Sequence, residues 1–344
     1  MEYIGGNALI IREINLNLVR RVLKAKGPST KQQLALETGL SLMTVGTVLQ
    51  YLMDQKEVLE SELSPSSGGR PAKKYCYNYG FAHALALFPY EKDGRVIIRS
   101  AVADLSGQIV NSADTEAEVI DLDSFEGIIE PLLGSYPSSK AIGFGYPGFD
   151  KDGQIVMSDY KKLAGASLAG HFSSLFKVPA IMENDVNAAV IGFTDRCKLN
   201  NEGILIYLYF PDRYPPGAGI FINGRLLKGK DNFAGEIGVI PLDVAWNELL
   251  YTSFEPFCEA AARLVTTLCG VLNPDRIIMN GSFLGEAHME AIAQKCGTRL
   301  PGHVLPVISL SDDFISDYQA GLIALTLAQL EPDIRLARKI HREV

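Results

Sequence analysis

The chain has 344 residues, of which 47% are hydrophobic, and a formal net charge of −8. This length exceeds one ordinary core and indicates two or three domains. No apolar run reaches the roughly 18–20 residues that span a bilayer, and no basic stretch followed by a hydrophobic segment opens the chain. We therefore expect a cytoplasmic protein with no membrane partner.

The cysteines and the charges narrow the class further. Five widely spaced cysteines contain no C-x-x-C pair, which disfavours a disulfide framework and a thiolate zinc site. Residues 1–80 hold ten Lys and Arg against seven Asp and Glu, a net of +3, so the rest of the chain carries −11. A mildly basic head on an acidic body is expected if only the head meets a polyanion.

The head begins with the pattern of a helix-turn-helix unit. Residues 12–27, REINLNLVRRVLKAKG, predict a helix that ends at Gly27 and Pro28. Its apolar face is expected to carry Ile14, Leu18, Val22 and Leu23. Residues 29–58 predict two more helices around a tight turn at residues 38–40. Gly39 gives that turn a permissive backbone, and Ser41 is the expected N-cap of the second helix.

The second of these helices has two distinct faces. Its core face is predicted to hold Val45, Val48, Leu49 and Leu52. The opposite face carries small polar and flexible side chains near the end that enters a major groove, where they meet phosphates, base edges and thymine methyls. These outward residues are Ser41, Met43, Thr44, Thr47 and Gln50.

A wing is predicted after this helix. Two β-prone runs flank a Ser/Pro/Gly tip that ends in Gly69-Arg70-Pro71, followed by Lys73 and Lys74. An extended segment with an arginine suits a narrow minor groove. We therefore expect a winged helix-turn-helix domain over residues 1–80 that binds duplex DNA through Ser41, Met43, Thr44, Thr47, Arg70 and Lys73. A plain three-helix packing unit with an ordinary loop is the alternative for each piece taken alone.

From about residue 81 onward, short β-rich runs alternate with helical segments. The runs FAHALALFPY, RVIIRSAVADLSGQIV, KAIGFGYPGF and PAIMEND predict strands of one set, with a helix in LDSFEGIIEPLLGSY. A second set follows in GILIYLYF, GAGIFINGRLLKG and DRIIMNG, with long helices in FEPFCEAAARLVTTLCGVLN and FISDYQAGLIALTLAQL. Hairpins followed by βα units, occurring twice, predict two similar α/β lobes with a cleft between them.

Several motifs carry a resemblance to a known family. They are GGRPA, ADLSGQIV, GFGYPGFD, ENDVNAAV, FAGEIG and LNPDRIIMNG. With them the chain resembles the ROK family (repressors, open reading frames and sugar kinases), in its NagC/XylR-like regulator branch. The resemblance implies two actin-like, RNase H-like lobes, residues 81–195 with 315–344 and residues 196–314. It also implies self-association and a sugar site in the cleft.

The same resemblance suggests which residues form the site. In the family's kinases the aspartate of E-N-D is the catalytic base, which corresponds to Asp185, while Asn184 and Glu236 correspond to residues that contact sugar hydroxyls. Gly148 of GFGYPGFD completes the expected ligand-binding set. Carboxylates and carboxamides suit sugars because each makes directed hydrogen bonds. The alternative is that Asn184 and Asp185 only cap the following helix.

The phosphate loops and the zinc cluster of the family have no counterpart in the sequence. Where the kinases carry an Asp-x-Gly-Gly-Thr hairpin, this chain has LFPYEKDGRV, in which Glu91 adds a negative charge. The second, glycine-rich phosphate loop is replaced by YFPDRYPPGAGIF, whose Pro215 and Pro216 lack amide donors. Val239 stands where the family has a metal-binding His, and Glu255 and Glu259 are weak candidates for a further sugar contact.

These features favour a transcriptional regulator, most simply a repressor, whose ROK body is catalytically inactive, with Asp185 a vestigial base. We expect a double-stranded DNA operator as partner, a sugar or sugar-like effector, and a homodimer or higher homo-oligomer, with no cofactor and no metal. Two alternatives stay open. One is an ATP-dependent sugar kinase with an added DNA-binding head, and the other is a regulator whose body is only an assembly scaffold.

Overall fold

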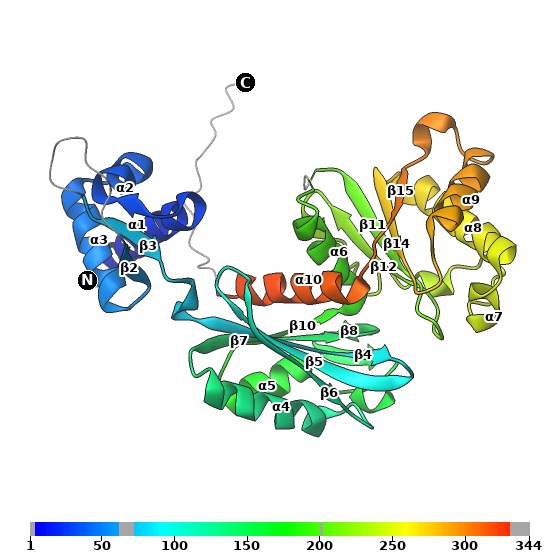
Figure 1. The fold of residues 1–344 in the computed structure, drawn as a ribbon, viewed down its shortest axis with the longest axis horizontal. Coiled ribbons are helices and arrows are strands. Elements are labelled where there is room, and N and C mark those ends of the chain that lie inside the picture. Colours follow the sequence, from blue (N-terminus) through cyan, green and yellow to red (C-terminus); the bar gives the residue numbers. More distant parts are fainter. Residues whose placement is uncertain (1–3, 62–71, 200–201, 331–344) are drawn as a thin grey trace. The chain divides into compact units, whose positions relative to one another are not determined.

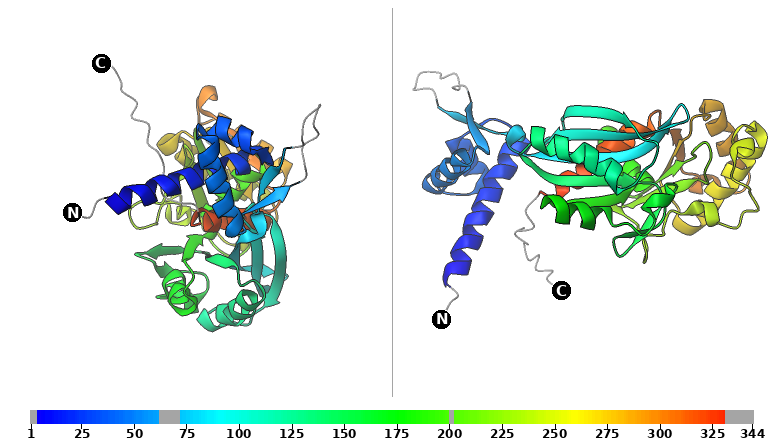
Figure 2. Two further views of the ribbon diagram at one scale, coloured as in Figure 1. Left: turned by 90° about the vertical axis from the view of Figure 1, so that its left-hand side faces the viewer. Right: turned by 90° about the horizontal axis from the view of Figure 1, so that it is seen from below.

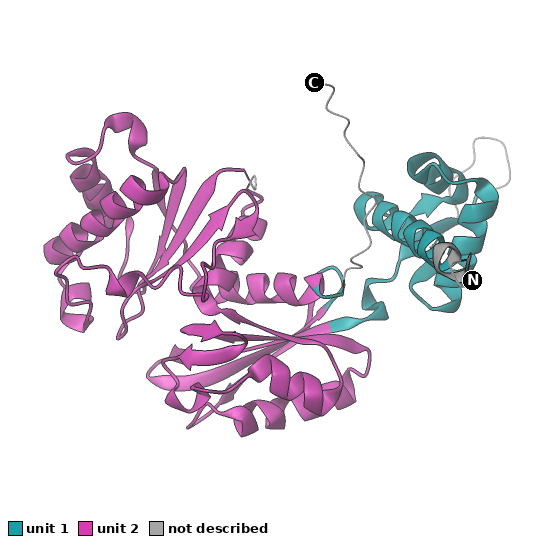
Figure 3. Ribbon diagram, turned by 180° about the vertical axis from the view of Figure 1, so that it is seen from behind, with its two compact units in different colours: residues 1–83, 104–106, 329–344 teal, residues 84–103, 107–328 magenta. Residues whose placement is uncertain are grey.

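The computed structural model describes residues 4–61, 72–199 and 202–330, with the side chains of residues 4–8 left aside. It divides into two compact units (Figure 3). Unit 1 comprises residues 1–83, 104–106 and 329–344, and unit 2 comprises residues 84–103 and 107–328. Within the described ranges, none of the helices combines the length and the apolar character needed to cross a bilayer.

Unit 1 contains three helices and a small antiparallel sheet (Figure 1). The helices are α1 (Ile4–Lys26), α2 (Lys31–Thr38) and α3 (Leu42–Asp54). The sheet has the order β1-β3-β2, with β1 (Ser29–Thr30), β3 (Lys74–Tyr77) and β2 (Val58–Ser61). Its core is formed by Leu16, Val19, Leu23, Leu34, Val45, Val48, Leu49, Leu52 and Val58.

The predicted helix ends and the turn in unit 1 are confirmed, although α1 begins at Ile4, before the predicted start at residue 12. Helix α1 ends at Lys26, and Gly27 follows with a φ of 74°. Gly39 adopts the left-handed conformation, with a φ of 72°, and its N–H donates to the Ala35 carbonyl to close α2. Ser41 then caps α3, because its hydroxyl accepts a hydrogen bond of 3.1 Å from the Thr44 N–H. The chain therefore turns sharply between α2 and α3, as the sequence predicts.

The buried face of α3 is the predicted one, and that of α1 is the predicted one in part. Val45, Val48, Leu49 and Leu52 are all buried. In α1 the predicted Leu23 is buried and Val22 packs against the same core, whereas Ile14 and Leu18 are half-exposed and Leu16 and Val19 are buried instead. Neighbouring apolar positions of α1 have helical spacing and lie side by side on the helix surface. Packing against α2 and α3 decides which of them turn inward, so the sequence alone predicted only part of the buried face.

The described part of unit 2 contains two five-stranded sheets of the same strand order. Read from the strand that comes third along the chain, the first sheet is β6-β5-β4-β7-β10 and the second is β13-β12-β11-β14-β15. In the first sheet the strands are β4 (His83–Lys92), β5 (Arg95–Asp104), β6 (Ile109–Glu116), β7 (Ser139–Tyr146) and β10 (Ala180–Asn184). In the second they are β11 (Ile204–Tyr209), β12 (Gly217–Ile222), β13 (Arg225–Leu226), β14 (Arg276–Asn280) and β15 (Val307–Leu310). Antiparallel strands followed by parallel crossovers therefore occur twice, as predicted.

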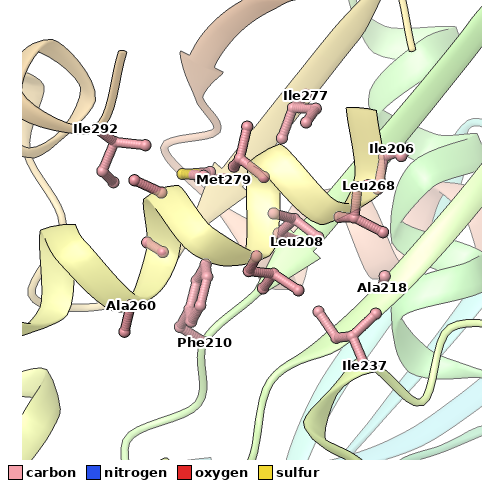
Figure 4. Packing of buried hydrophobic residues seen from close by; sticks show 14 of the residues in the cluster. Ile206, Leu208, Phe210, Ala218, Ile237, Ala260, Leu268, Ile277, Met279 and Ile292 are labelled. Carbon is pink, nitrogen blue, oxygen red and sulfur yellow. The ribbon is translucent and has the colours of Figure 1, made fainter. Parts of the chain in front are cut away.

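Helices cover both sheets (Figures 1 and 2). α4 (Leu122–Ser135) and α5 (Leu168–Phe176) pack on the outer face of the first sheet. α8 (Phe254–Leu272) and α9 (Glu286–Gly297), preceded by the short α7 (Glu248–Tyr251), cover the second, where Leu268 and Ile292 pack on Phe210, Ile277 and Met279 (Figure 4). α6 (Asp185–Arg196) and α10 (Phe314–Ala328) share a third core with both sheets.

The two shared helices cross at glycines. A Cβ atom at Gly192 of α6 would lie 1.9 Å from the Asp317 carbonyl oxygen, and one at Gly321 of α10 would lie 1.8 Å from the Ala188 carbonyl oxygen. The backbones therefore approach closely only because neither position has a side chain. At the same crossing the fully buried Asp317 accepts hydrogen bonds from Arg196 of α6 and from Tyr207 of β11, which ties the helix pair to the second sheet.

Candidate functional site

A cavity of about 320 Å³ opens in unit 2 and brings the predicted site residues together. Gly148 follows β7, Asn184 and Asp185 lie where β10 passes into α6, and Glu236 follows the β12–β13 hairpin. All four line the cavity, although the motifs that contain them are separated by up to 88 positions along the chain. Its volume lies at the lower end of the range for small-molecule sites.

Two glycines shape the cavity wall. Gly148 has a φ of 111°, and a Cβ there would lie 2.0 Å from the Met157 carbonyl oxygen, which belongs to the hairpin of β8 (Phe149–Lys151) and β9 (Gln154–Met157). Gly235 has a φ of 108°, and its Cβ would lie 2.1 Å from the Ala218 carbonyl oxygen. A side chain at either place would be strained and would push backbone into the cavity. These positions therefore require glycine.

Asn184 is a structural cap as well as a cavity residue. Its side-chain oxygen accepts a hydrogen bond of 2.9 Å from the Asn187 N–H, and its Nδ2 donates one of 2.9 Å to the Gly148 carbonyl. Asn184 therefore caps α6 and also fastens the turn after β7, while it lines the cavity. One Nδ2 hydrogen remains for a ligand.

Asp185 and two other carboxyl groups form an acidic cluster in the wall. Asp185 is only 9% exposed, and burial, together with the charges of Asp159 and Glu236, raises its pKa to about 8. Burial by the surrounding wall and the charge of Glu91 raise the pKa of Asp159 to about 6. Burial and Asp159 also raise the pKa of Glu236. Burial and the neighbouring carboxyl groups both disfavour ionisation, so Asp185 holds its proton near neutral pH.

A smaller cavity of about 110 Å³ adjoins the same residues, since Asp159, Asp185 and Tyr209 line both. Its wall adds Glu91 from β4 and Asp212 from the segment after β11, and Arg213 is its one basic side chain. Pro89 and Pro211 also line it, and neither has an amide hydrogen. Such a wall repels a phosphate group instead of binding it.

The remaining predicted positions lie as follows. Val239 lines the larger cavity and is 66% exposed, so this part of the cavity wall is apolar. Glu255 and Glu259 are elsewhere, because both pair with Lys295 of α9 on the surface of the second sheet's helices, which makes them surface helix charges. Within the described ranges, no group of three or more His, Cys, Asp or Glu side chains is arranged to hold a metal ion.

Sequence reasoning missed three kinds of cavity residue. Asp159 follows β9 in a loop without a motif, and its role is visible only once the hairpin folds over the cavity. Asn187 belongs to the ENDVNAAV motif but was not among the predicted site residues. Tyr209 and Tyr214 line both cavities and were not among them either.

In unit 1 the predicted DNA-contact residues lie on the exposed side of α3. Met43 is 83% exposed, Ser41 and Thr47 are exposed, and Thr44 is half-buried. Thr47 Oγ1 donates a hydrogen bond to the Met43 carbonyl, and its hydroxyl must break this bond before it can donate to DNA. Lys73 contacts Glu60 in an exposed ion pair, which is weak in water. Arg70 and the rest of the GGRPA segment up to Pro71 lie outside the described residues.

One basic residue near α3 was not predicted. The Lys31 ammonium, from the first turn of α2, lies over Gly46 of α3, where a Cβ would come within 2.3 Å of it. Lys31 therefore places a positive charge beside Gly46, next to Thr47 in the sequence of α3.

The raised pKa of Asp185 gives a testable effect of pH on stability. A carboxyl group whose pKa is higher in the folded protein than its ordinary 3.8 destabilises the fold as pH rises from about 4 to about 8, because the folded state must give up a proton that it holds more tightly. Asp185→Asn removes this dependence and keeps an oxygen to accept the Val186 N–H. At pH 8 we expect the variant to be the more stable by at least about 1.4 kcal/mol, the equivalent of one pKa unit.

The measurement is urea unfolding of both proteins at pH 5, 6.5 and 8. At pH 5 their stabilities are expected to be much closer than at pH 8. A difference that stays constant across this range would show that Asp185 is ionised in the folded protein throughout.

The chain is similar to known proteins over most of its length. Residues 93–258 match the model of the ROK family. The xylose repressor of Bacillus subtilis (strain 168) is 26% identical over 242 residues, which cover 68% of this chain and 62% of that protein. The chain thus spans less than two thirds of this relative's length.

Two solved structures share the fold. A ROK family transcriptional regulator, a homolog of the E. coli MLC protein, matches with a TM-score of 0.63 at 17% identity, over 93% of this chain and all of that one. The ROK hexokinase of Thermus thermophilus matches with a TM-score of 0.58 at 16% identity, over 72% of this chain and 99% of that one. Unit 2 therefore has a mixed α/β architecture whose sheets resemble those of actin-like sugar kinases.

Proposed function

From the ROK family domain that this chain carries, we propose that the protein is a DNA-binding transcriptional regulator, in its simplest form a repressor. Unit 1 is the DNA-binding part, a winged helix-turn-helix over residues 1–80. Unit 2 is a body without kinase activity that self-associates and binds a small hydroxylated effector. The proposed body comprises two lobes, residues 81–195 with 315–344 and residues 196–314, and unit 2 holds residues 84–103 and 107–328 of it.

The observation that carries this proposal is the exposed face of α3. A sharp turn at Gly39 presents α3 beyond α2, and the first turns of α3 expose Met43 and Thr47 while the opposite face is buried. A helix that follows such a turn and exposes short side chains at its amino-terminal end has the form of a recognition helix. Lys31 supplies a phosphate contact beside it, and β2 and β3 form the stem of the wing.

Two features of unit 2 support a body without kinase activity, although Asp185 holds a position suited to a general base. The adjoining cavity carries Glu91 and Asp212 where a phosphoryl group needs donors. Pro215 and Pro216 in the wall cannot offer amide hydrogens. Asn184, Asp185, Glu236 and Gly148 then serve as ligand contacts only.

An ADP-release assay tests the kinase alternative directly. The full chain is incubated with ATP, Mg²⁺ and a panel of sugars, with Asp185→Asn as the matched variant. We expect no sugar-dependent release above that of the variant. Turnover with the unsubstituted chain that disappears in Asp185→Asn would establish a kinase with an added DNA-binding head.

Contacts across the larger cavity give the effector a way to act. Asn232, from the loop after β13, donates to Asp150 of β8 at 3.2 Å, and Lys228 of the same loop pairs with the buried Glu183 of β10. These contacts join the two sheets of unit 2 beside the ligand site. A ligand that changes them shifts the balance between two arrangements of the body, and in an oligomer this alters the spacing of the DNA-binding parts.

The scaffold alternative makes a different prediction for ligands. A body that only assembles the protein has no small-molecule site, so no compound should raise its Tm. A thermal-shift screen of neutral, cationic and phosphorylated sugars separates the two cases. Stabilisation that depends on Glu236 supports the sensing body.

A further inference from the structure

The wall of the larger cavity is acidic. Asp159, Asp185 and Glu236 contribute three carboxyl groups, and none of the residues that line this cavity is Lys, Arg or His. Two basic side chains of neighbouring segments do not line this cavity. Lys228 pairs with Glu183. The exposed Arg213 lines the smaller cavity, together with Glu91 and Asp212, but not the larger one. A ligand that enters the larger cavity therefore meets hydrogen-bond acceptors and negative charge.

Two buried side chains in this wall have acceptor oxygens that the protein does not fully use. Asp185, 9% exposed, accepts a hydrogen bond from the Val186 N–H on Oδ1, and within the described ranges no side chain donates to its carboxyl group. Asn187, 5% exposed, donates through Nδ2 to Glu183, while its fully buried Oδ1 has no hydrogen-bond partner. Buried acceptors are rarely left unpaired in a native protein. Once its proton is displaced, the Asp185 carboxyl group therefore favours a ligand that is rich in donors.

Aromatic rings add a second kind of preference. Tyr209 lines both cavities and stacks on Phe314, with ring centroids 3.7 Å apart and an interplanar angle of 3°. Tyr214 lines both cavities as well. The faces of tyrosine rings attract cations, most strongly where water is excluded. Rings beside unpaired carboxyl groups are a common means of holding an ammonium group.

We propose that the effector of this cavity is a small hydroxylated amine, an amino sugar with a free ammonium group, and that Asp159, Asp185 and Glu236 hold its positive charge. This inference rests on the proposed sensing function and specifies its ligand class. The sugar hydroxyls bind Asn184 and Asn187, and Val239 packs against the ring. The cavity of about 320 Å³ accommodates one ring of this kind.

The same features exclude other ligands. A phosphorylated sugar brings negative charge into a wall that has no basic side chain. A neutral sugar brings no positive charge to offset an ionised carboxyl group of this wall. A divalent cation requires several well-placed ligands, and no group of three or more His, Cys, Asp or Glu side chains in the described part of the chain has that arrangement.

Binding of an ammonium group has a signature that a neutral ligand lacks. A positive charge beside Asp185 favours its ionised form, so the ligand displaces the proton that this group holds in the free protein. The other ionisable groups facing Asp185 are Asp159, Glu236, Glu183, Tyr146, Tyr160, Tyr209 and Tyr318. None of these groups carries a positive charge, so none can take the place of the ligand's ammonium group beside Asp185. Affinity should rise with pH as long as the amine stays protonated.

The test uses glucosamine, galactosamine and mannosamine with the full chain, by thermal shift and calorimetry at pH 7. Two derivatives of glucosamine serve as controls. N-acetylglucosamine has the same ring without the positive charge, and glucosamine 6-phosphate has the same ring with an added negative group. We expect at least one free amine to raise the Tm and to bind at least about tenfold more tightly than both matched compounds. Calorimetry in two buffers of different ionisation enthalpy should show proton release on binding.

Variants assign the effect to the cavity. Asp159→Asn keeps the shape of the side chain and should remove the preference for the amine, with an expected loss of about tenfold in affinity. Glu255→Gln removes an equal charge from an exposed site outside the cavity and should change nothing. The Tm of each unliganded variant verifies its folding.

Three results would overturn the inference. They are tighter binding of N-acetylglucosamine or of the phosphate ester, equal affinity of Asp159→Asn for the amine, and the absence of binding by all three amines. DNA binding by the unliganded chain is measured separately. If it persists while the amines fail, the ligand class is wrong and the regulator stands; if it is absent, the proposed function itself fails.

Discussion

Replacing Gly192 with alanine is expected to destabilise unit 2 by about 3 kcal/mol, at the upper end of what overpacking usually costs. The added Cβ would lie 1.9 Å from the Asp317 carbonyl oxygen and 2.6 Å from the Gly321 nitrogen. Both contacts are with backbone, which cannot rotate away as a flexible side chain does. The helices must therefore separate, and the buried contacts between α6 and α10 are lost.

Gly270→Ala is the matched control. Gly270 lies inside α8, and a Cβ there meets nothing within 4 Å. Alanine in an open helix interior is expected to stabilise by about 0.5–1 kcal/mol, because it restricts the unfolded chain. Urea unfolding and Tm of both variants check the pair. Equal stabilities would mean that α6 and α10 do not cross at Gly192 as described.

The change Thr47→Glu is expected to weaken specific DNA binding by more than tenfold, which corresponds to at least about 1.4 kcal/mol. Thr47 is exposed on the face of α3 that carries Met43. A carboxylate at this position would face the phosphates of the duplex and repel them. Because Thr47 makes only an internal bond to the Met43 carbonyl, the stability of unit 1 should change little.

Thr267→Glu controls for the added charge. Thr267 of α8 also donates to the carbonyl four residues earlier, that of Arg263, but it lies in unit 2. Fluorescence anisotropy with a labelled operator duplex at two salt concentrations measures both variants. The proposal predicts a loss for Thr47→Glu alone. Equal affinity of the two variants for DNA would remove α3 from the binding surface.

Local sequence rules predicted much of unit 1. The turn at Gly39, the cap at Ser41 and the buried face of α3 each depend on residues within one or two helical turns, so their signals are complete in the sequence. The buried face of α1 was predicted only in part, because it depends on the helices against which α1 packs. The position of Lys31 over Gly46 depends on the crossing of two helices and could not be read from spacing.

The candidate site was predicted in part. Asn184, Asp185, Glu236 and Gly148 meet in one cavity, as the resemblance implies. Asp159 was missed, since its loop is brought to the cavity only by the β8–β9 hairpin. The acidity of the wall was missed for the same reason, because it comes from carboxyl groups that lie far apart along the chain. Motifs indicated where the site lies, and tertiary packing determined its charge.

If unit 1 makes this chain a sequence-specific DNA-binding protein, as we propose, selection of duplexes from a random pool by the purified full chain should show it most directly. We expect enrichment of one motif, an affinity that falls as salt rises, and loss of enrichment with Thr47→Glu. No enrichment by a folded chain, or equal enrichment by Thr47→Glu, would contradict it.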